Sequence, residues 1–324
     1  MHTIQELQQI IDKAVKETAY PATPKELYEP ISYLMSLGGK RLRPALVLMA
    51  TDLFGGAIED AISPALAVEL FHNFTLMHDD IMDKAPLRRG KPTVHAKWNE
   101  AVAILSGDVM FVKAYQMMIQ VKPDILSSVL AIFNETAIGV CEGQQIDMNF
   151  ECRAQVGIPE YLEMIKLKTA VLLGGALKIG ALIGNASEKD AQNLYDFGVN
   201  LGIAFQLQDD ILDVYGDPEK FGKQVGGDII SNKKTFLLIK ALELAKGAKA
   251  DELNHWLNLK TFDSKEKVKS VTAIYDSLGI RQLSEELMND FADKAYQALD
   301  SIHLPETQKQ TLNDFATLLV DREH

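Results

Sequence analysis

The fold is decided by the stretch FHNFTLMHDDIMD, residues 71–83. Its apolar residues recur at helical spacing, and it contains neither Gly nor Pro. Because each residue of an α-helix turns by about 100°, Asp79 and Asp83 share a face, and Asp80 lies just beside it. Neighbouring carboxylates on an apolar helix repel one another unless cations are present. Oxygen-only ligands suit magnesium that binds a phosphate, so the stretch predicts a magnesium site.

A second copy of this acidic motif follows in FQLQDDILD, residues 205–213. Asp209, Asp210 and Asp213 repeat the Asp-Asp-x-x-Asp spacing, again with apolar residues between the acids. The copies lie 209 − 79 = 130 positions apart, which excludes a tandem low-complexity run. The pair predicts two helices that face each other across a cleft and hold divalent metals between them.

Composition limits the class of protein. The chain has 324 residues, of which 47% are hydrophobic and 24% charged, enough for a large core. Because the two motifs must converge, we expect one domain over residues 1–324. A net charge of −12 argues against nonspecific nucleic-acid binding. Two cysteines make no disulfide framework or zinc spacing, and no signal peptide or membrane span is evident, which favours a cytoplasmic protein.

Helical periodicity recurs along the chain, and no segment alternates with a period of two. Ser63-Pro64 resembles a helix start, because a capping residue precedes a proline. Pro159 opens a helix that ends near Gly184-Asn185, and Ser187 with Asp190 resembles a capping box. The prediction is an all-α fold, a single bundle of long helices. Further helices are expected over residues 7–15, from after Pro44 to Phe54, and over 99–121 and 124–147. Three or four more are expected after residue 213, including one that starts near Asp263 and one after Pro305.

Basic loops accompany both acidic motifs. KAPLRRGKP, residues 84–92, carries four cations beside the first motif, and a guanidinium binds phosphate oxygens bidentately. GGKRLR, residues 38–43, could hold a second phosphate group but does not match a nucleotide-binding phosphate loop. Lysines also surround the second motif. Together they predict two phosphorylated substrates and no covalent nucleophile.

An ordered set of motifs closely resembles the trans-isoprenyl diphosphate synthases, the polyprenyl synthetase family that includes geranylgeranyl and farnesyl diphosphate synthases. The set runs from residue 38 to residue 235 and comprises GGKRLRP, HDDIMD followed by RRGKPTVH, LKT, FQLQDDILD, GKQVGGD and NKKT. The resemblance implies the isoprenoid synthase fold, with helices around a central cavity. It also implies a homodimer.

The resemblance assigns roles to individual residues. It implies about three magnesium ions, held by Asp79, Asp83 and Asp209 and bound to the diphosphate of an allylic substrate. Asp80, Asp210 and Asp213 complete the acidic shells. Residues matching positions that contact the same diphosphate are Arg88, Lys168, Thr169, Gln206, Lys223 and Lys233. Residues matching the isopentenyl diphosphate site are Lys40, Arg43, His72 and Arg89. Arg41, between two matched residues, is expected to point to solvent.

The implied reaction joins isopentenyl diphosphate to an allylic carbocation that forms when the allylic diphosphate leaves. The growing apolar chain runs past Thr75, Phe74 and Phe71. In the family, aromatic residues four or five places before the first Asp form a floor that stops elongation. Phe74 stands five places before Asp79 and Thr75 four. One large and one small residue favour geranylgeranyl diphosphate as the product, with farnesyl or longer products as alternatives.

Three other functions are compatible with parts of the pattern. A class I terpene cyclase also uses aspartate-rich motifs, but it would leave Lys40, Arg43 and Arg89 unexplained. A non-catalytic subunit of a prenyl synthase typically lacks one acidic motif, whereas both are intact here. A metal-binding helical scaffold would release no diphosphate from an allylic substrate and isopentenyl diphosphate.

Overall fold

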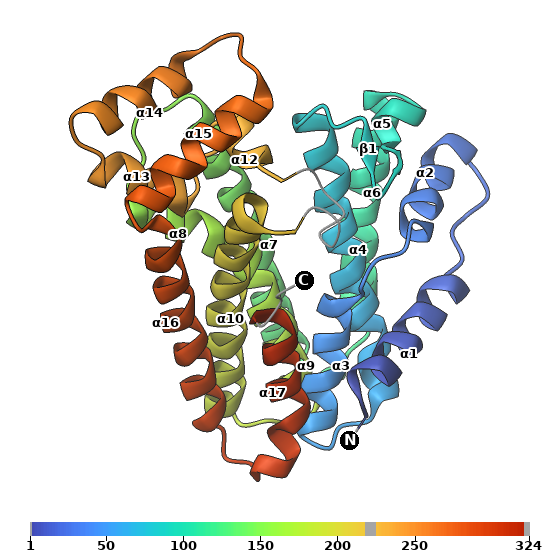
Figure 1. Cartoon of the computed structure of the whole chain (residues 1–324). Helices are drawn as coiled ribbons and strands as arrows, with labels where there is room; N and C mark the ends of the chain where they lie inside the picture. Colours follow the sequence, from blue (N-terminus) through green and yellow to red (C-terminus); the bar gives the residue numbers. More distant parts are fainter. Residues whose placement is uncertain (1, 218–224, 321–324) are drawn as a thin grey trace. The chain divides into compact units, whose positions relative to one another are not determined.

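The computed structural model describes residues 2–217 and 225–320, which form two compact units. Unit one takes its described residues from 1–134, 175–195 and 303–312, and unit two from 135–174, 196–302 and 313–324. Among the described residues, four helices contribute residues to both units. They are labelled in Figure 1 as α7 (Leu126–Glu151), α9 (Val171–Ile183), α10 (Glu188–Tyr215) and α17 (Glu306–Val320).

Unit one is built around α4 (Ile58–Met82), which packs against α3 (Leu42–Leu53) and α6 (Glu100–Met118). Nine of the twelve residues of α3 are buried, in keeping with its nearly continuous apolar sequence. Asn99 caps α6 by accepting a 2.9 Å hydrogen bond from the amide of Val102. The remaining elements of this unit are α1 (Ile4–Glu17), α2 (Lys25–Ser36), β1 (Leu87–Arg88), β2 (Lys91–Pro92) and α5 (Val94–Lys97).

Unit two packs shorter helices against α15 (Ser264–Ser277) and α16 (Ile280–Asp300). The helix that the sequence predicts to start near Asp263 is α15, and Asp263 caps it by accepting a 2.9 Å hydrogen bond from the amide of Glu266. The remaining elements of this unit are α8 (Ile158–Ile165), the π-helical turn η1 (Lys166–Ala170), α12 (Gly227–Ser231), α13 (Phe236–Leu244) and α14 (Ala248–Asn258).

The all-α prediction is confirmed, with two local corrections. Helix α4 begins at Ile58, so the expected start at Ser63-Pro64 is wrong. Buried Ile58 and Ala61 extend its apolar face upstream, and acidic residues in the first turn favour the helix dipole. Residues 84–92 contain a small antiparallel hairpin, β1–β2. Its turn residues Arg89 and Gly90 both have positive φ, which suits a two-residue hairpin.

No helix in residues 2–217 and 225–320 has both the length and the apolar character needed to cross a bilayer. A cytoplasmic location and a single domain over residues 1–324 stay predictions of the sequence.

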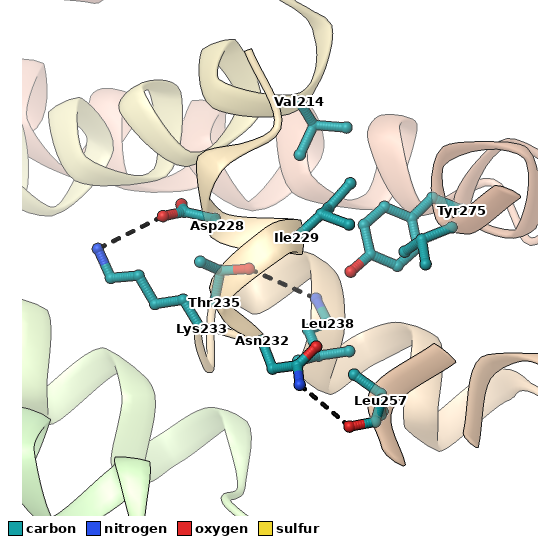
Figure 2. A pocket seen from close by; sticks show the side chains of 10 residues that line it. Val214, Asp228, Ile229, Asn232, Lys233, Thr235, Leu238, Leu257 and Tyr275 are labelled. Carbon is teal, nitrogen blue, oxygen red and sulfur yellow. Dashed lines mark hydrogen bonds and ion pairs between the residues drawn. The ribbon is translucent and has the colours of Figure 1, made fainter. Parts of the chain in front are cut away.

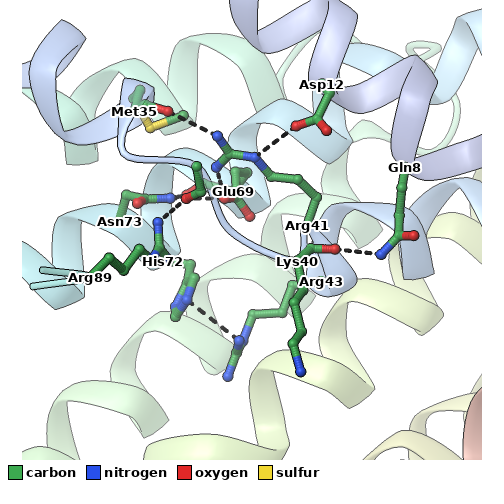
Figure 3. A network of polar contacts seen from close by, with 11 residues as sticks. Gln8, Asp12, Met35, Lys40, Arg41, Arg43, Glu69, His72, Asn73 and Arg89 are labelled. Atoms are coloured by element: carbon green, nitrogen blue, oxygen red, sulfur yellow. Dashed lines mark hydrogen bonds and ion pairs between the residues drawn. The ribbon is translucent and has the colours of Figure 1, made fainter. Parts of the chain in front are cut away.

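A buried ion pair fixes the 38–43 loop to α4, and it corrects the expectation for Arg41. The Arg41 side chain is 3% exposed and donates to the carboxylate of Glu69, which is 4% exposed (Figure 3). It also donates to the carbonyl oxygen of Met35 at 2.8 Å and to Asp12 Oδ1 at 3.2 Å. Asn73 donates to the same Glu69 carboxylate at 3.0 Å. The guanidinium therefore lies in the interior, because Glu69 on α4 is a buried charge that needs a cation.

Replacing Arg41 with Met should lower the free energy of unfolding by about 3–5 kcal/mol, because the Glu69 charge is left buried and unpaired. Urea unfolding monitored by circular dichroism measures the loss. The double variant Arg41→Met/Glu69→Leu should recover most of it, because no charge then remains inside. Arg281→Met is the matched control: its pair with Glu285 is exposed, so the cost should stay within about 1 kcal/mol. Equal losses in Arg41→Met and the control would contradict this account.

Candidate active site

The first acidic motif occupies the C-terminal end of α4, where one of its three acids is held by an arginine. Asp80 is buried, and Arg88 binds it bidentately, with Nε–Oδ2 and Nη2–Oδ1 distances of 2.8 Å. Asp79 is partly exposed and Asp83 is exposed at the end of the helix. The side chains of the motif therefore differ in environment: one is fixed inside the protein and the others reach towards solvent.

The hairpin sends its two adjacent arginines to different places. Arg88 on β1 binds Asp80, whereas Arg89 in the turn donates from Nη1 to the carbonyl oxygen of Gly38. The turn thus brings the loop after the first acidic motif against the 38–43 loop. Because the two arginines are adjacent in the sequence, their different partners could not be predicted from the sequence alone.

A cluster of basic side chains forms beside the 38–43 loop. Arg43 Nη1 lies 3.4 Å from His72 Nε2 on α4, and both groups are drawn in Figure 3. Burial lowers the pKa of His72 well below its ordinary value, and the nearby charges of Arg43 and Arg89 lower it further. The ring is therefore neutral at pH 7. Four predicted residues, Lys40, Arg43, His72 and Arg89, come from this loop, α4 and the hairpin, and the structure brings Arg43 and His72 into contact.

Phe71 and Phe74, two of the three residues predicted to set chain length, lie in an aromatic cluster within unit one. The ring of Phe74 stacks on that of Phe111 from α6, with centroids 5.1 Å apart and an interplanar angle of 17°. Phe71 is buried and lies within 6 Å of the rings of Phe74, Phe111 and Phe133. Thr75 makes no ring contact; its hydroxyl donates to the carbonyl oxygen of His72 at 2.8 Å. Phe111 and Phe133 are partners that the sequence motifs did not reveal.

The second acidic motif lies on α10 in unit two, and one of its acids is also buried. Asp210 accepts a 2.5 Å hydrogen bond from the Tyr161 hydroxyl and one of 3.0 Å from Gln206 Nε2. The pKa of Asp210 is raised to about 7, chiefly by burial and in part by Asp228, although Lys233, Tyr161 and Gln206 oppose the shift. Burial and the Asp210 charge raise the pKa of Tyr161 well above its ordinary value. The Tyr161 hydroxyl therefore stays protonated and is the donor of the hydrogen bond to Asp210.

Asp213 fixes the segment that follows the motif. Its Oδ2 accepts a 2.9 Å hydrogen bond from the amide of Asp228, and its carbonyl oxygen accepts one of 2.6 Å from Gly226. Asp228 Oδ1 in turn lies 3.8 Å from Lys233 Nζ, a pair drawn in Figure 2. The third acid of the motif therefore ties α10 to the turn that carries Lys233.

The Lys168-Thr169 pair lies in the π-helical turn η1, where the sequence predicts one uninterrupted α-helix. The amide of Val171 donates to the carbonyl oxygen of Lys166, five residues earlier, so the turn is wider than an α-helical turn. Consecutive side chains are then separated by a smaller angle about the helix axis than the roughly 100° of an α-helix. A Cβ at position 143 would lie 2.2 Å from the backbone nitrogen of Lys168, so only glycine permits this approach of η1 to α7.

Side chains from η1, α10 and the turn that carries Lys233 line one pocket in unit two. Lys168 Nζ donates to Asp147 at 2.5 Å, and the Thr169 hydroxyl donates to Gln206 Oε1 at 3.4 Å. The empty space measures about 340 Å³, including its solvent-open part. The lining residues are Asp147, Tyr161, Met164, Ile165, Lys168, Thr169, Gln206, Asp210, Lys233, Lys234 and Thr235. Five of them are predicted site residues. Lys223, another residue expected to contact the diphosphate, lies outside the described residues.

Two residues of this pocket, Asp147 and Tyr161, were missed by reasoning from the sequence. Asp147 lies on α7 within GQQID, residues 143–147, where an acid follows an apolar residue as in both acidic motifs. That was the available signal. Tyr161 offered none, because a lone tyrosine in an amphipathic helix is most simply a core residue.

Each acidic motif carries carboxylate oxygens, the donor type that a hard cation prefers. Among the described residues, no group of three or more His, Cys, Asp or Glu side chains is arranged to hold an ion by itself. Asp80, Asp210 and Asp213 each have a carboxylate oxygen that accepts a hydrogen bond from a protein donor. The residues fit magnesium, which takes few carboxylates and completes its shell with water and phosphate.

Known proteins resemble the chain over most of its length. The model of the polyprenyl synthetase family matches residues 24–275. A geranylgeranyl diphosphate synthase of Methanosarcina mazei is 44% identical over 243 residues, 74% of each chain. A short chain isoprenyl diphosphate synthase of Methanothermobacter thermautotrophicus is 35% identical over 325 residues, covering 100% of this chain and 99% of that protein. A crystal structure of a geranylgeranyl pyrophosphate synthase superposes with a TM-score of 0.95 at 43% identity over the full length of both chains.

These similarities agree with the motifs and with the all-α fold, and they confirm the isoprenoid synthase fold that the sequence implied. The chain therefore belongs to the polyprenyl synthetase family and is a prenyltransferase.

Proposed function

We propose that this short-chain trans-prenyl diphosphate synthase condenses isopentenyl diphosphate with allylic diphosphates and releases geranylgeranyl diphosphate. One observation carries the proposal: each Asp-Asp-x-x-Asp motif has a buried acid held by protein donors and lies beside basic side chains suited to a diphosphate. Relatives of similar length are named geranylgeranyl synthases, which supports the twenty-carbon product.

The allylic diphosphate is assigned to Arg88 and to the pocket of unit two. Lys168, Thr169, Gln206 and Lys233 line that pocket, and their ammonium, hydroxyl and amide groups can donate to phosphate oxygens. Burial alone would lower the pKa of Lys233, but Asp228, Asp210 and the other nearby carboxylates raise it. Its amine therefore stays charged at neutral pH and can bind a diphosphate.

Isopentenyl diphosphate is assigned to the basic cluster of Lys40, Arg43, His72 and Arg89. Arginine binds phosphate bidentately, and the lysine adds a second positive charge. The neutral His72 ring can donate one hydrogen bond without adding charge to two neighbouring guanidinium groups. The buried Arg41–Glu69 pair supports the loop that carries this cluster.

The family is magnesium-dependent, and we assign about three ions to Asp79, Asp83 and Asp209. Bound magnesium would neutralise charge on the leaving diphosphate. Asp80, Asp210 and Asp213 act as supports, since Arg88, Tyr161 and the amide of Asp228 hold them.

The chain's own groups then favour ionisation of the allylic substrate. The C1–O bond breaks and its electron pair leaves with the diphosphate, whose charge Lys168 and Lys233 stabilise. The isopentenyl double bond attacks the allylic cation to form the new C–C bond. A proton leaves the adduct and is taken by the released diphosphate. Exclusion of water protects the cation from quenching.

The aromatic cluster is assigned as the floor of the space for the growing chain. Phe74 presents a ring five places before Asp79, and Phe111 backs it in a stacked pair. Thr75 is small, so space remains beside Phe74 for a chain longer than farnesyl.

Two rivals are less well supported. A terpene cyclase needs no second diphosphate site, so the cluster around His72 would have no role. A non-catalytic subunit would not need both motifs with their supporting partners. Farnesyl or longer products remain the alternatives within the proposed reaction.

We also propose a homodimer, with α6 in the interface. Leu105, Val112 and Ile119 are spaced seven residues apart along α6 and its end, and each is at least 50% exposed. Such a row forms one apolar face on a helix, which suits burial against a second copy.

Asp79→Ala should lower the rate of diphosphate release by at least about 1000-fold, because a ligand of the ions that stabilise the transition state is lost. The assay uses magnesium, isopentenyl diphosphate and each of three allylic starters. Asp60→Ala, on the first turn of the same helix, should keep near-normal turnover. Near-normal rates in Asp79→Ala, with circular dichroism unchanged, would reject the metal role.

Phe74→Ala should lengthen the product, because removing the ring opens the floor. Phe111→Ala should also lengthen it, and Phe74→Tyr should leave it unchanged because the stack is kept. Chromatography of products labelled from radioactive isopentenyl diphosphate measures chain length. Unchanged product size in Phe74→Ala would reject Phe74 as the floor.

Val112→Glu should convert the homodimer to a monomer, because a charge would be buried in an apolar interface. Size-exclusion chromatography with light scattering measures the mass. Leu244→Glu, at an exposed apolar position of α13, should leave the mass unchanged. A monomeric unmodified protein would refute the dimer, and a dimeric Val112→Glu variant would refute the assigned interface.

A further inference from the structure

Lys267 on α15 is a fully buried cation in unit two. Among the described residues no carboxylate forms an ion pair with it. Its Nζ lies 4.2 Å from the centre of the Phe262 ring and is satisfied by neutral oxygens. Burying an ammonium group without a counter-charge is costly, so a lysine here needs a reason beyond filling space.

The ammonium group binds the segment at the end of α12. Nζ donates to Asn232 Oδ1 at 2.6 Å and to the carbonyl oxygen of Ile230 at 3.2 Å. Ile230 is in the last turn of the short helix α12, where carbonyl oxygens lack helical partners and favour a cation. The lysine thus supplies both donors and charge to the end of this helix.

Asn232 is held from two sides and in an unusual conformation. It has a φ of 56°, in the left-handed region that asparagine tolerates better than most residues. Its Nδ2 donates to the carbonyl oxygen of Leu257 at 3.1 Å, the bond drawn in Figure 2. Lys267 and Leu257 therefore bind opposite ends of one amide, which fixes the direction in which the chain leaves α12.

The next residue in the chain is Lys233. Its amide donates to the carbonyl oxygen of Asp228, and its own carbonyl oxygen accepts from Thr235, both at 2.9 Å. Lys233 therefore lies in a tight turn whose entry is set by Asn232. Its side chain reaches Asp228 and lines the pocket of the second acidic motif.

The N-terminal side of α12 is seated on α15 as well. A Cβ at Gly226 would lie 2.6 Å from Cγ2 of Val268, the neighbour of Lys267, and Gly226 has a φ of 85°. Both ends of α12 thus depend on two consecutive residues of α15.

We propose that Lys267 is a positioning residue, which acts through Asn232 to hold the Lys233 amine over the diphosphate pocket. This inference rests on the proposed function, since it names a residue that would tune binding of the allylic diphosphate. Lys267 itself does not line the pocket. Its removal should therefore weaken binding of one substrate and leave the chemistry at the other site unchanged.

The test is steady-state kinetics of the full chain with each substrate varied in turn. Lys267→Met should raise the KM for the allylic diphosphate about tenfold, as expected when a charged hydrogen-bonding group is lost. The KM for isopentenyl diphosphate should change by less than about twofold, because that site is built from other residues. Lys267→Arg keeps the charge and donors and should restore most of the affinity. Asn232→Gly keeps the left-handed backbone without the amide and should also raise the allylic KM.

Lys309→Met is the matched control. Lys309 is likewise buried, but it pairs with Glu306 on α17 and should move neither KM. Equal effects of the two variants on both KM values, or an unchanged allylic KM in Lys267→Met and Asn232→Gly, would overturn the positioning role. An inert unmodified protein would instead refute the proposed function. If Lys267→Met does not fold, Asn232→Gly and Lys267→Arg decide the question.

Discussion

Buried carboxylates on apolar helices, each needing a donor or a cation, are the constraint on which this structure depends. Asp80 is held by Arg88, and Glu69 on the same helix is held by Arg41. Asp210 instead has neutral donors, and burial raises its pKa to about 7. A partner left out at any of these positions would leave a charge inside the protein. Loops that would otherwise be free are therefore attached to the long helices.

The same constraint divides each acidic motif between support and chemistry. Fixed acids such as Asp80 and Asp213 orient the helix end and the following loop through their hydrogen bonds. Under the proposed function, the remaining acids meet the metal ions and the diphosphate. The hydrogen bonds of the fixed acids thus hold the neighbouring acids of each motif in place despite their like charges.

Much of this was predictable from the sequence because it depends on spacing. The helix of the first motif, the helix start near Asp263 and the grouping of Lys168 with Thr169 follow from local patterns. The start of α4 did not, because buried Ile58 and Ala61 outweigh the proline signal at Ser63-Pro64.

Long-range partners were the other gap between prediction and structure. Arg41 turns inward only because Glu69, 28 positions away, is buried. Asp147 and Tyr161 join the pocket through contacts with Lys168 and Asp210, at separations of 21 and 49 positions. No periodic pattern encodes such pairs. That the two acidic motifs face each other stays a prediction.

The wide turn at Lys166–Ala170 has a consequence for partly unfolded forms of the protein. Its i→i+5 bonding is held by packing against Gly143, whereas an isolated segment would relax to the commoner i→i+4 pattern. Such a relaxation would rotate Lys168 away from Thr169 while the helical content hardly changed. A partly unfolded form would thus keep a native-like far-ultraviolet circular dichroism spectrum after its affinity for a substrate had been lost.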